Sequence, residues 1–260
     1  MGQFAVIFPA AGRSTRFGDP KQKKIFAELD GRAVWLRAIE PFVNRDDVGQ
    51  MIVVISPEDR ELFARRYEAS VAFLGITVID GGAERSDSVA GALEMVDPSC
   101  EYIAVHDAAR PCLTSELVDL VFDAARRHGA ALPAVPVADT IKRVGEDRFT
   151  TGTIPRGGLY LAQTPQAFRR DLLLRAYADR ARIGAGVTDD TQLVEASGHP
   201  CAVVEGSPLN LKITTAADLR LATAILQALP KPKGEGPVHP FADERAMWGE
   251  SPAPKASDLF

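Results

Sequence analysis

The chain begins with a short apolar run that leads into a loop of small and basic residues: positions 3–22 read QFAVIFPAAGRSTRFGDPKQ. Residues 3–8 lack a clean alternation of polar and apolar side chains, as expected for a β-strand covered on both faces. The small residues at 9–12 let the backbone approach a ligand closely and offer its N–H groups to phosphate oxygens. This stretch therefore predicts a buried first strand followed by a phosphate-binding loop.

Strand-like and helix-like patterns alternate from there to about residue 135. Further strand-like runs occupy 51–55, 76–79, 101–105 and 130–135, and amphipathic helical patterns occupy 34–43, 58–68, 86–96 and 115–128. Thr114 suits the N-cap of the last of these helices, and Gly129 follows its end. Such alternation is typical of right-handed βαβ units. We therefore predict an α/β fold with a Rossmann-like, mostly parallel sheet and helices on both faces.

The pattern changes after residue 135. Residues 139–144 and 159–168 read as extended pieces around a polar stretch at 145–158, which predicts a β-arm over about 137–162 that stands off the main sheet. The remaining elements are predicted as helices at 170–183, 190–197 and 216–229 and a strand at 202–205. Thr215 and Asp218 resemble a capping box for the final helix.

The composition predicts one domain over residues 1–229 and a tail over 230–260. The tail is rich in Pro, Lys, Gly, Glu and Ser without periodicity, which is typical of disorder. For the 260-residue chain, 46% hydrophobic and 25% charged residues suit a soluble α/β domain. A net charge of −5 gives no general attraction for nucleic acid or a membrane surface, so a phosphorylated ligand needs a local basic cluster.

The cysteines and the first residues bear on the compartment. Cys100, Cys112 and Cys201 are far apart and odd in number, which argues against a disulfide framework or a zinc site. No signal-peptide pattern precedes the first strand, and no apolar run approaches the ~20 residues of a membrane span. We therefore expect a cytoplasmic protein.

The loop after the first strand carries two cations, Arg16 and Lys21, on a turn stiffened by Pro and Gly. Neither the dinucleotide fingerprint GxGxxG nor the P-loop ending GK[ST] is present. Nucleotidyl transfer needs positive charge where negative charge spreads over the α-phosphate and the departing pyrophosphate. A planar guanidinium and a mobile ammonium can supply it, so the loop is a candidate for that chemistry.

Two further blocks follow predicted strands. Residues 80–89 read DGGAERSDSV, in which the glycines free the backbone and Ser86 or Ser88 opens a helix whose N-terminus can hold anionic groups. Residues 105–111 read VHDAARP and place Asp107 at the carboxyl end of a parallel strand, where open α/β sheets bind ligands. Asp107 can bind Mg²⁺ together with substrate phosphates, and Arg110 can pair with Asp107 or reach a phosphate.

Taken together, these motifs resemble the cytidylyltransferase branch of the sugar-phosphate nucleotidyltransferases. The loop PAAGxxxR with PKQ, the block GGxxRxxSV, HDAARP, PVxDTxK, TPQ and GxxxNxK[VI]T all occur between residues 5 and 225. Three positions depart from the family pattern: Ser14 replaces Gly, Ala83 replaces a frequent Asp, and Thr191 replaces a common Ala. The resemblance implies a Rossmann-like domain with a nucleotide-binding loop.

The resemblance also implies roles for individual residues. Catalytic cations would be Arg16, Lys21, Arg156 and Lys212. Nucleotide contacts would come from Pro9, Ala10, Ala11, Gly12, Ser14, Gly81, Gly82, Ser88 and Ala108. Contacts to the acceptor substrate would come from Asp107, Arg110, Thr140, Arg156, Thr164, Thr188 and Lys212, with Asp107 also as a metal ligand.

The implied reaction is transfer of CMP from CTP to 2-C-methyl-D-erythritol 4-phosphate, with release of pyrophosphate, in non-mevalonate isoprenoid biosynthesis. Ala109 stands where ribitol-phosphate cytidylyltransferases commonly have Val, which favours the erythritol acceptor. Mg²⁺ as cofactor and a homodimer, in which the arm lends Thr140 and Arg156 to the partner's site, are also implied. Two alternatives stay open: ribitol 5-phosphate as acceptor, and a non-catalytic nucleotide-binding protein on the same fold.

Overall fold

A central β-sheet organises the protein. The computed structural model describes residues 2–12, 14, 17, 23–183 and 186–229. Within them, an eight-stranded sheet contains β1 (Gln3–Pro9), β4 (Val48–Ile55), β5 (Thr77–Asp80), β6 (Cys100–Val105), β7 (Ala130–Pro136), β10 (Tyr160–Ala162), β11 (Gln166–Arg169) and β12 (Ala202–Glu205). The predicted tail, 230–260, lies outside the described residues, so its disorder stays a prediction.

The sheet is mostly parallel, as predicted. β6, β1, β4 and β5 run parallel in that spatial order, and β12 runs parallel to β7. β11 is antiparallel to both β6 and β7, and β10 is antiparallel to β7. The chain moves outward from β1 through β4 to β5 and then returns to β6 on the other side of β1. The strand order therefore reverses between β1 and β6, which is where open α/β sheets bind ligands.

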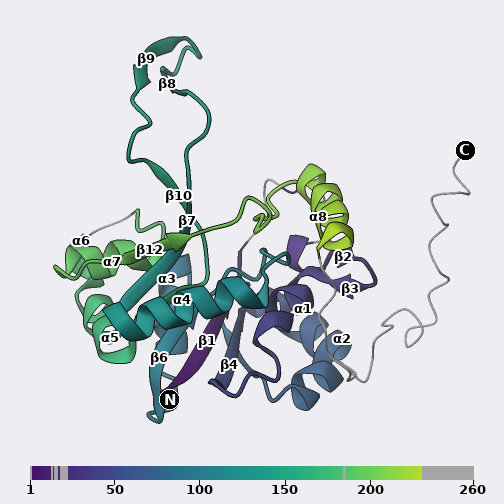
Figure 1. Cartoon of the computed structure of the whole chain (residues 1–260). Helices are drawn as coiled ribbons and strands as arrows, with labels where there is room; N and C mark the ends of the chain where they lie inside the picture. The colour runs from purple at the N-terminus through teal and green to yellow at the C-terminus, as the bar shows by residue number, and fades with distance from the viewer. Residues whose placement is uncertain (1, 13, 15–16, 18–22, 184–185, 230–260) are drawn as a thin grey trace, which may run out of the picture.

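Helices cover both faces of the sheet (Figure 1). They are α1 (Val34–Ile39), α2 (Arg60–Phe73), α3 (Arg85–Leu93), α4 (Ser115–His128), α5 (Arg170–Ala178), α6 (Arg180–Ile183), α7 (Asp190–Ala196) and α8 (Ala216–Ala228). Alternate residues of β1 point to opposite faces, because successive strand side chains do. Phe4, Val6 and Phe8 pack with α1, α2 and α4, whereas Ala5 and Ile7 pack with α3, α5 and α7.

Several local signals in the sequence are confirmed. The expected bounds of α4 and β12 are those of the structure. The Thr114 hydroxyl accepts a hydrogen bond from the Leu117 N–H, and Gly129 ends α4 in the left-handed conformation, with φ of 83°. Thr215 and Asp218 form the expected capping box at the start of α8. The expected helix at 34–43 is α1 followed by a short 3₁₀ turn, Glu40–Phe42.

The start of α3 differs from the prediction. Its N-cap is Glu84 rather than Ser86 or Ser88, and the Asp87 carboxylate accepts a hydrogen bond from the Glu84 N–H at 3.2 Å. The Ser88 hydroxyl is not available as a cap, because it accepts from the Gly82 N–H and donates to the Glu84 carbonyl, both at 3.1 Å. The helix also ends three residues earlier than expected, at Leu93 rather than 96.

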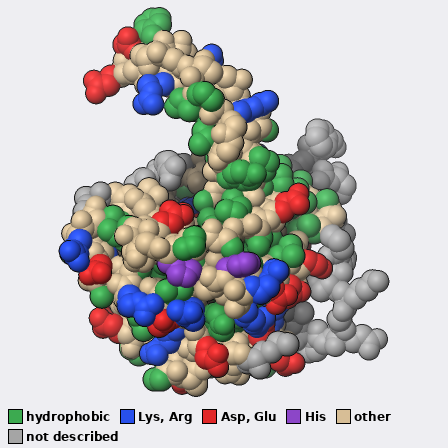
Figure 2. Space-filling view, turned by 60° about the vertical axis from the view of Figure 1, so that its left-hand side comes forward, with side chains coloured by type: hydrophobic (Ala, Val, Ile, Leu, Met, Phe, Trp, Pro, Cys, Tyr) green, Lys and Arg blue, Asp and Glu red, His purple; other side chains and the backbone are tan. Residues whose placement is uncertain are grey.

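The arm is present but is built differently from the prediction. Its hairpin pairs β8 (Ile141–Val144) with β9 (Thr150–Ile154), and β9 lies inside the stretch expected to be a polar loop. The expected extended piece at 159–168 is instead two strands of the main sheet, β10 and β11. Figures 1 and 2 show the β8–β9 hairpin standing away from the body, whose visible face carries interspersed acidic and basic side chains.

A further small hairpin, β2 (Glu28–Leu29) with β3 (Arg32–Ala33), lies beside α8. Leu29, Val34 and Cys112 pack there with Ile213 and Ile225 in a third apolar cluster. Through this cluster, the C-terminal part of the described chain packs against the segment that follows the first loop. Residues 210–213 therefore lie next to the carboxyl end of β6.

Candidate active site

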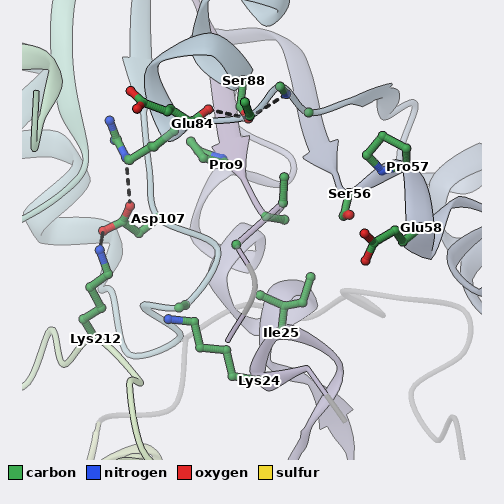
Figure 3. Close-up of a pocket in the computed structure, with 18 residues that line it drawn as sticks. Pro9, Lys24, Ile25, Ser56, Pro57, Glu58, Glu84, Ser88, Asp107 and Lys212 are labelled. Atoms are coloured by element: carbon green, nitrogen blue, oxygen red, sulfur yellow. Dashed lines mark hydrogen bonds and ion pairs between the residues drawn. The ribbon is translucent and has the colours of Figure 1, made fainter. Parts of the chain in front are cut away.

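A pocket of about 450 Å³ opens at the carboxyl ends of the parallel strands, at the point where the strand order reverses (Figure 3). Its walls come from segments far apart in the sequence. They are Pro9, Ala10, Ala11, Gly12, Lys24, Ile25, Ser56, Pro57, Glu58, Gly81, Gly82, Ala83, Glu84, Arg85, Ser88, Asp107, Ala109 and Lys212. Most of the residues predicted to contact a nucleotide therefore lie around one cavity.

Two glycine-containing loops form one side of the pocket. The Ala10 N–H donates to the Val54 carbonyl and the Gly81 N–H to the Ile55 carbonyl, both at 2.7 Å. A Cβ on Gly81 would lie only 2.5 Å from the Ala11 Cβ. Glycine is therefore required there by close approach of the two loops rather than by an unusual φ.

An aspartate between cations forms the opposite side. The Lys212 ammonium lies 2.8 Å and the Arg110 Nε 3.4 Å from Asp107 Oδ2, while the Arg85 Nε lies 3.7 Å from Asp107 Oδ1. Burial acts to raise the pKa of the Asp107 carboxyl, but Lys212, Arg85 and Arg110 outweigh burial and hold that pKa well below its usual range. Asp107 is therefore ionised and holds Lys212 at the pocket wall.

Buried polar groups brace Asp107 from behind. The Thr164 hydroxyl accepts from the Asp107 N–H at 3.0 Å, and the Asn210 amide donates to the Thr164 carbonyl at 2.9 Å. The Arg110 guanidinium donates to the Asn210 carbonyl at 2.8 Å. Of the two roles left open for Arg110, the structure shows the pairing with Asp107. Neither Thr164 nor Arg110 lines the pocket, so both stabilise its wall.

His106 is a packing residue of the core behind the site. It is fully buried, and its ring contacts Phe8 and Phe42. Burial lowers the pKa of His106 to about 4, so the imidazole is neutral near pH 7. One ring nitrogen lies 3.0 Å from the Thr164 hydroxyl and the other 3.2 Å from the Arg110 carbonyl, which fixes the ring in place.

Other predicted site residues lie away from this pocket. Thr140 and Arg156 are exposed on the arm, where Arg156 donates to the Ala138 carbonyl. Thr188 is exposed and hydrogen-bonds Gln192. Ala108 is buried behind the wall and does not line it.

The first loop is described only in part. Arg16 and Lys21, the two cations predicted to be catalytic, lie outside the described residues. Ser14 has a φ of 53°, in the left-handed region, and its hydroxyl accepts from the Lys24 N–H at 3.3 Å. That backbone conformation explains why the family pattern places Gly at this position.

The sequence analysis assigned no role to two residues that line the pocket, Arg85 and Lys24. Arg85 could have been chosen as a candidate, because it is the fixed arginine of the GGxxRxxSV block, but the sequence does not show which groups its side chain contacts. Lys24, whose ammonium donates to the Ile213 carbonyl at 2.9 Å, stands in a KQKK run that also suits a solvated surface. Both add positive charge to the pocket.

The described residues hold no cluster of three or more His, Cys, Asp and Glu side chains that could bind a metal. Asp107 therefore lines the pocket without a ready-made set of protein ligands around it. Among the described helices, none combines the length and the apolar character needed to cross a membrane.

Comparison with known proteins agrees with this geometry. The chain is 42% identical to the 2-C-methyl-D-erythritol 4-phosphate cytidylyltransferase of Rhodopirellula baltica, over 85% of this chain and 94% of that one. It is 39% identical to the bifunctional enzyme IspD/IspF of Rhodospirillum rubrum, over 91% of this chain but only 59% of that longer protein. The crystal structure of 2-C-methyl-D-erythritol 4-phosphate cytidylyltransferase from Thermus thermophilus superposes with a TM-score of 0.72 at 35% identity, covering 87% of this chain and 100% of that one.

The family described as IspD, 2-C-methyl-D-erythritol 4-phosphate cytidylyltransferase, matches residues 4–228. That span includes the described sheet except Gln3, the first residue of β1, and every described residue of the pocket. The matched pocket combines small-residue loops with a cation cluster, as a nucleotidyltransferase requires. This chain belongs to the 2-C-methyl-D-erythritol 4-phosphate cytidylyltransferase family.

Proposed function

We propose that this chain transfers CMP from CTP to 2-C-methyl-D-erythritol 4-phosphate, giving 4-diphosphocytidyl-2-C-methyl-D-erythritol and pyrophosphate, at the pocket between β1 and β6. One observation carries the assignment of the site: glycine-containing loops and the Asp107–Lys212–Arg85 ion cluster face each other across one cavity. Loops of this kind can hold a nucleotide, and cations beside them can neutralise its phosphates.

The reaction needs no side-chain base. A phosphate oxygen of the acceptor, already an anion, attacks the α-phosphorus of CTP in line, and the bond from that phosphorus to the bridging oxygen of the β-phosphate breaks. Pyrophosphate leaves with the bonding electron pair. Catalysis then consists of positioning and of neutralising charge, which is the role we assign to Lys212 and, outside the described residues, to Arg16 and Lys21.

The nucleoside end of CTP fits the opposite wall. Gly81 and Gly82 expose backbone there, and the Ser88 hydroxyl holds the Gly82 N–H in place. We assign the cytosine and ribose to this side, with the triphosphate running along residues 9–12 towards Lys212. Ala83 has no polar side chain, so polar contacts to the base come from the backbone at this position.

Mg²⁺ fits the chemistry of this pocket. The ion prefers one or two carboxylates together with substrate phosphates and water, and Asp107 is an ionised carboxylate at the wall. Asp107 would hold the ion, which supplies positive charge to the phosphates of CTP when bound. Asp107 therefore has a second role besides holding Lys212.

The arm suggests a shared site. Thr140 and Arg156 are exposed on or beside the β8–β9 hairpin, which stands away from the body of its own chain (Figure 1) and contributes no residue to that chain's pocket. We propose a homodimer in which the arm of one subunit brings Thr140 and Arg156 to the acceptor phosphate at the other subunit's pocket. Such an arrangement makes each site depend on two chains.

Acceptor identity is tested by pyrophosphate release from CTP and Mg²⁺. Parallel reactions contain 2-C-methyl-D-erythritol 4-phosphate, D-ribitol 5-phosphate, or no acceptor. We expect release only with the erythritol phosphate, because Ala109 lines the pocket at the position where ribitol-phosphate cytidylyltransferases commonly have Val. Release only with ribitol phosphate would replace the acceptor but keep the chemistry. CTP binding without turnover on either acceptor would support a nucleotide-binding protein instead.

Site sharing is tested by subunit complementation. Arg156→Met and Lys212→Met chains are each expected to be nearly inactive. Random mixing at equal amounts makes half of the dimers hybrid, and each hybrid then has one intact site of two, so activity recovers to about a quarter of wild type. No recovery from a mixture that demonstrably exchanges subunits would contradict the shared site.

A further inference from the structure

A chain of ion pairs extends from the pocket wall into the protein interior, past the residues to which the proposed function gives a role. Asp190 of α7 is fully buried, and its carboxylate accepts two hydrogen bonds from Arg85, at 3.1 and 2.7 Å. The Tyr177 hydroxyl of α5 donates to the same carboxylate at 2.5 Å. Helices α3, α5 and α7 thus meet at one buried carboxylate.

The geometry at Asp190 fixes the direction of the Arg85 side chain. A buried carboxylate must be paired and hydrogen-bonded, because burial of an isolated charge is very costly. Arg85 satisfies both oxygens of Asp190 through its two terminal nitrogens, which leaves its Nε facing Asp107 at 3.7 Å. The guanidinium is planar, so the bidentate pair with Asp190 also sets the orientation of Nε.

The Asp107 carboxylate is held from two sides. Arg85 faces Oδ1, while Lys212, at 2.8 Å, and Arg110, at 3.4 Å, both contact Oδ2. Figure 3 shows Lys212 below Asp107, with the ion pair between them marked by a dashed line. A carboxylate that lost Arg85 would keep only its contacts at Oδ2, so its orientation towards Lys212 would be less firmly fixed.

We propose that Arg85 is a positioning residue of this active site: clamped by Asp190 and Tyr177, it fixes the Asp107 carboxylate that holds Lys212 towards the reacting phosphates. The inference rests on the proposed function, which gives Lys212 its role. It extends the working site to α5 and α7, which do not line the pocket.

The first variant is Arg85→Lys, which keeps the charge but loses the planar fork. A lysine cannot make two parallel bonds to Asp190 and reach Asp107 at the same time. We expect kcat to fall about ten- to hundred-fold, as when a group that orients a reacting residue is lost. The KM for CTP and the CTP affinity measured by calorimetry should change only a few-fold, because the nucleoside wall at Gly81 and Gly82 is untouched.

The second variant is Tyr177→Phe, which removes one donor to Asp190 and keeps the buried ring. We expect a several-fold loss of kcat with little change in either KM. This variant tests the proposal even if Arg85→Lys folds poorly, since Tyr177 has no contact with the pocket. A melting curve for each variant sets the temperature at which all chains are folded.

Arg45→Lys is the matched control. Arg45 also makes a bidentate pair with a carboxylate, Asp47, and reaches a second one, Asp119, but it lies at the other end of the sheet. Its replacement should lower stability without changing kcat.

A wild-type kcat in folded Arg85→Lys and Tyr177→Phe would overturn the proposal. A raised KM at unchanged kcat would also overturn it, because that result indicates direct substrate binding by Arg85. If the wild-type protein is inactive with both acceptors, the proposed function is overturned, and this inference with it.

Discussion

The two ends of the central sheet carry ion clusters that look alike in composition and differ in purpose. At the carboxyl end, Arg85, Arg110 and Lys212 surround Asp107, with Asp190 behind Arg85. Cations outnumber carboxylates there, three to two, and the cluster faces a pocket. Arg85 and Lys212 of this cluster line the pocket, where a phosphate can approach them.

At the amino end, the balance is reversed. Arg45 and Arg126 both contact Asp47, at 2.9 and 2.8 Å, and each also contacts a further aspartate of α4, Asp119 or Asp123. None of these five side chains lines the pocket. The comparison teaches that an ion cluster alone does not mark a site. The cluster assigned to the site is the one that also lines a cavity, and the cluster assigned to stability lines none of that pocket.

Among the variants that test the difference between the two clusters, loss of Lys212 is expected to have the largest effect, and it falls on kcat. Lys212→Met removes the pocket cation held by Asp107, and removal of a charge-stabilising group of this kind costs about 10³-fold in kcat. Stability should change less than kcat does, because Arg85 and Arg110 still pair with the Asp107 carboxylate. Arg45→Met, in the other cluster, should show the opposite pattern. Equal loss of kcat in the two variants would contradict the distinction.

Loss of Phe122 is expected to be the next largest effect, and it falls on stability. Phe122 is fully buried and stacks on Phe4 with ring centroids 3.7 Å apart, beneath the Arg45 guanidinium. Phe122→Ala leaves a cavity, which should lower the free energy of unfolding by about 3 kcal/mol or more. Urea unfolding measures this loss, while kcat without urea should stay within about two-fold of wild type. A large fall in kcat in the folded variant would show that the amino end is coupled to the pocket.

The sequence predicted the parts of the fold that rest on local signals. The uninterrupted apolar run of β1 indicated a strand covered on both faces, and α4 carried a cap at each end. The strand at Thr150–Ile154 was missed because four of its five residues are exposed Thr or Gly, although Thr and Ile favour β-structure. The insertion of β11 between β6 and β7 depends on contacts between distant segments, which no local pattern encodes.

For the candidate site too, the sequence predicted the motifs but not the contacts between distant residues. Asp107 was expected at the carboxyl end of a parallel strand, where open α/β sheets bind ligands, and it lines one pocket with the motifs that follow β1 and β5. The pairing of Arg85 with Asp190 was not predictable, since 105 positions separate the two residues. Nor did the sequence show that Thr164 is buried and uses its hydroxyl to hold the Asp107 N–H.

Asp47→Asn should give a moderate and pH-dependent loss of stability. Burial acts to raise the pKa of Asp47, but Arg45 and Arg126 lower it more, so the folded pKa lies below the ordinary 3.8. The contribution of this carboxylate is therefore fully present above about pH 4 and is lost as the pH falls through the folded pKa. We expect a loss of about 1–2 kcal/mol at pH 7 that shrinks towards pH 3, measured by urea unfolding.

The control for this prediction is Asp123→Asn. Asp123 also pairs with Arg126, at 3.1 Å, but its side chain is 65% exposed. Exposed pairs contribute little, so its replacement should be nearly neutral at both pH values. An equal loss in the two variants, or a loss at Asp47 that does not change with pH, would contradict the assignment of the amino-end cluster to stability.

The smallest expected effect concerns a residue near the pocket whose backbone conformation, rather than its charge, is unusual. Ser14 and Asn44 both have positive φ, 53° and 59°. Ser14 follows the pocket residues 9–12, and Asn44 directly precedes Arg45 of the amino-end cluster. Ser14→Gly relieves strain of about 1 kcal/mol, offset by the greater freedom of glycine in the unfolded chain and by loss of the Lys24 hydrogen bond. We expect a net change within about 0.5 kcal/mol in unfolding experiments and an unchanged kcat.

Asn44→Gly is the comparison variant. It should gain less stability than Ser14→Gly, because asparagine tolerates this conformation better than serine. A loss of kcat in Ser14→Gly alone would show that the hydroxyl itself takes part at the pocket, and that this departure from the family pattern is chemical rather than conformational.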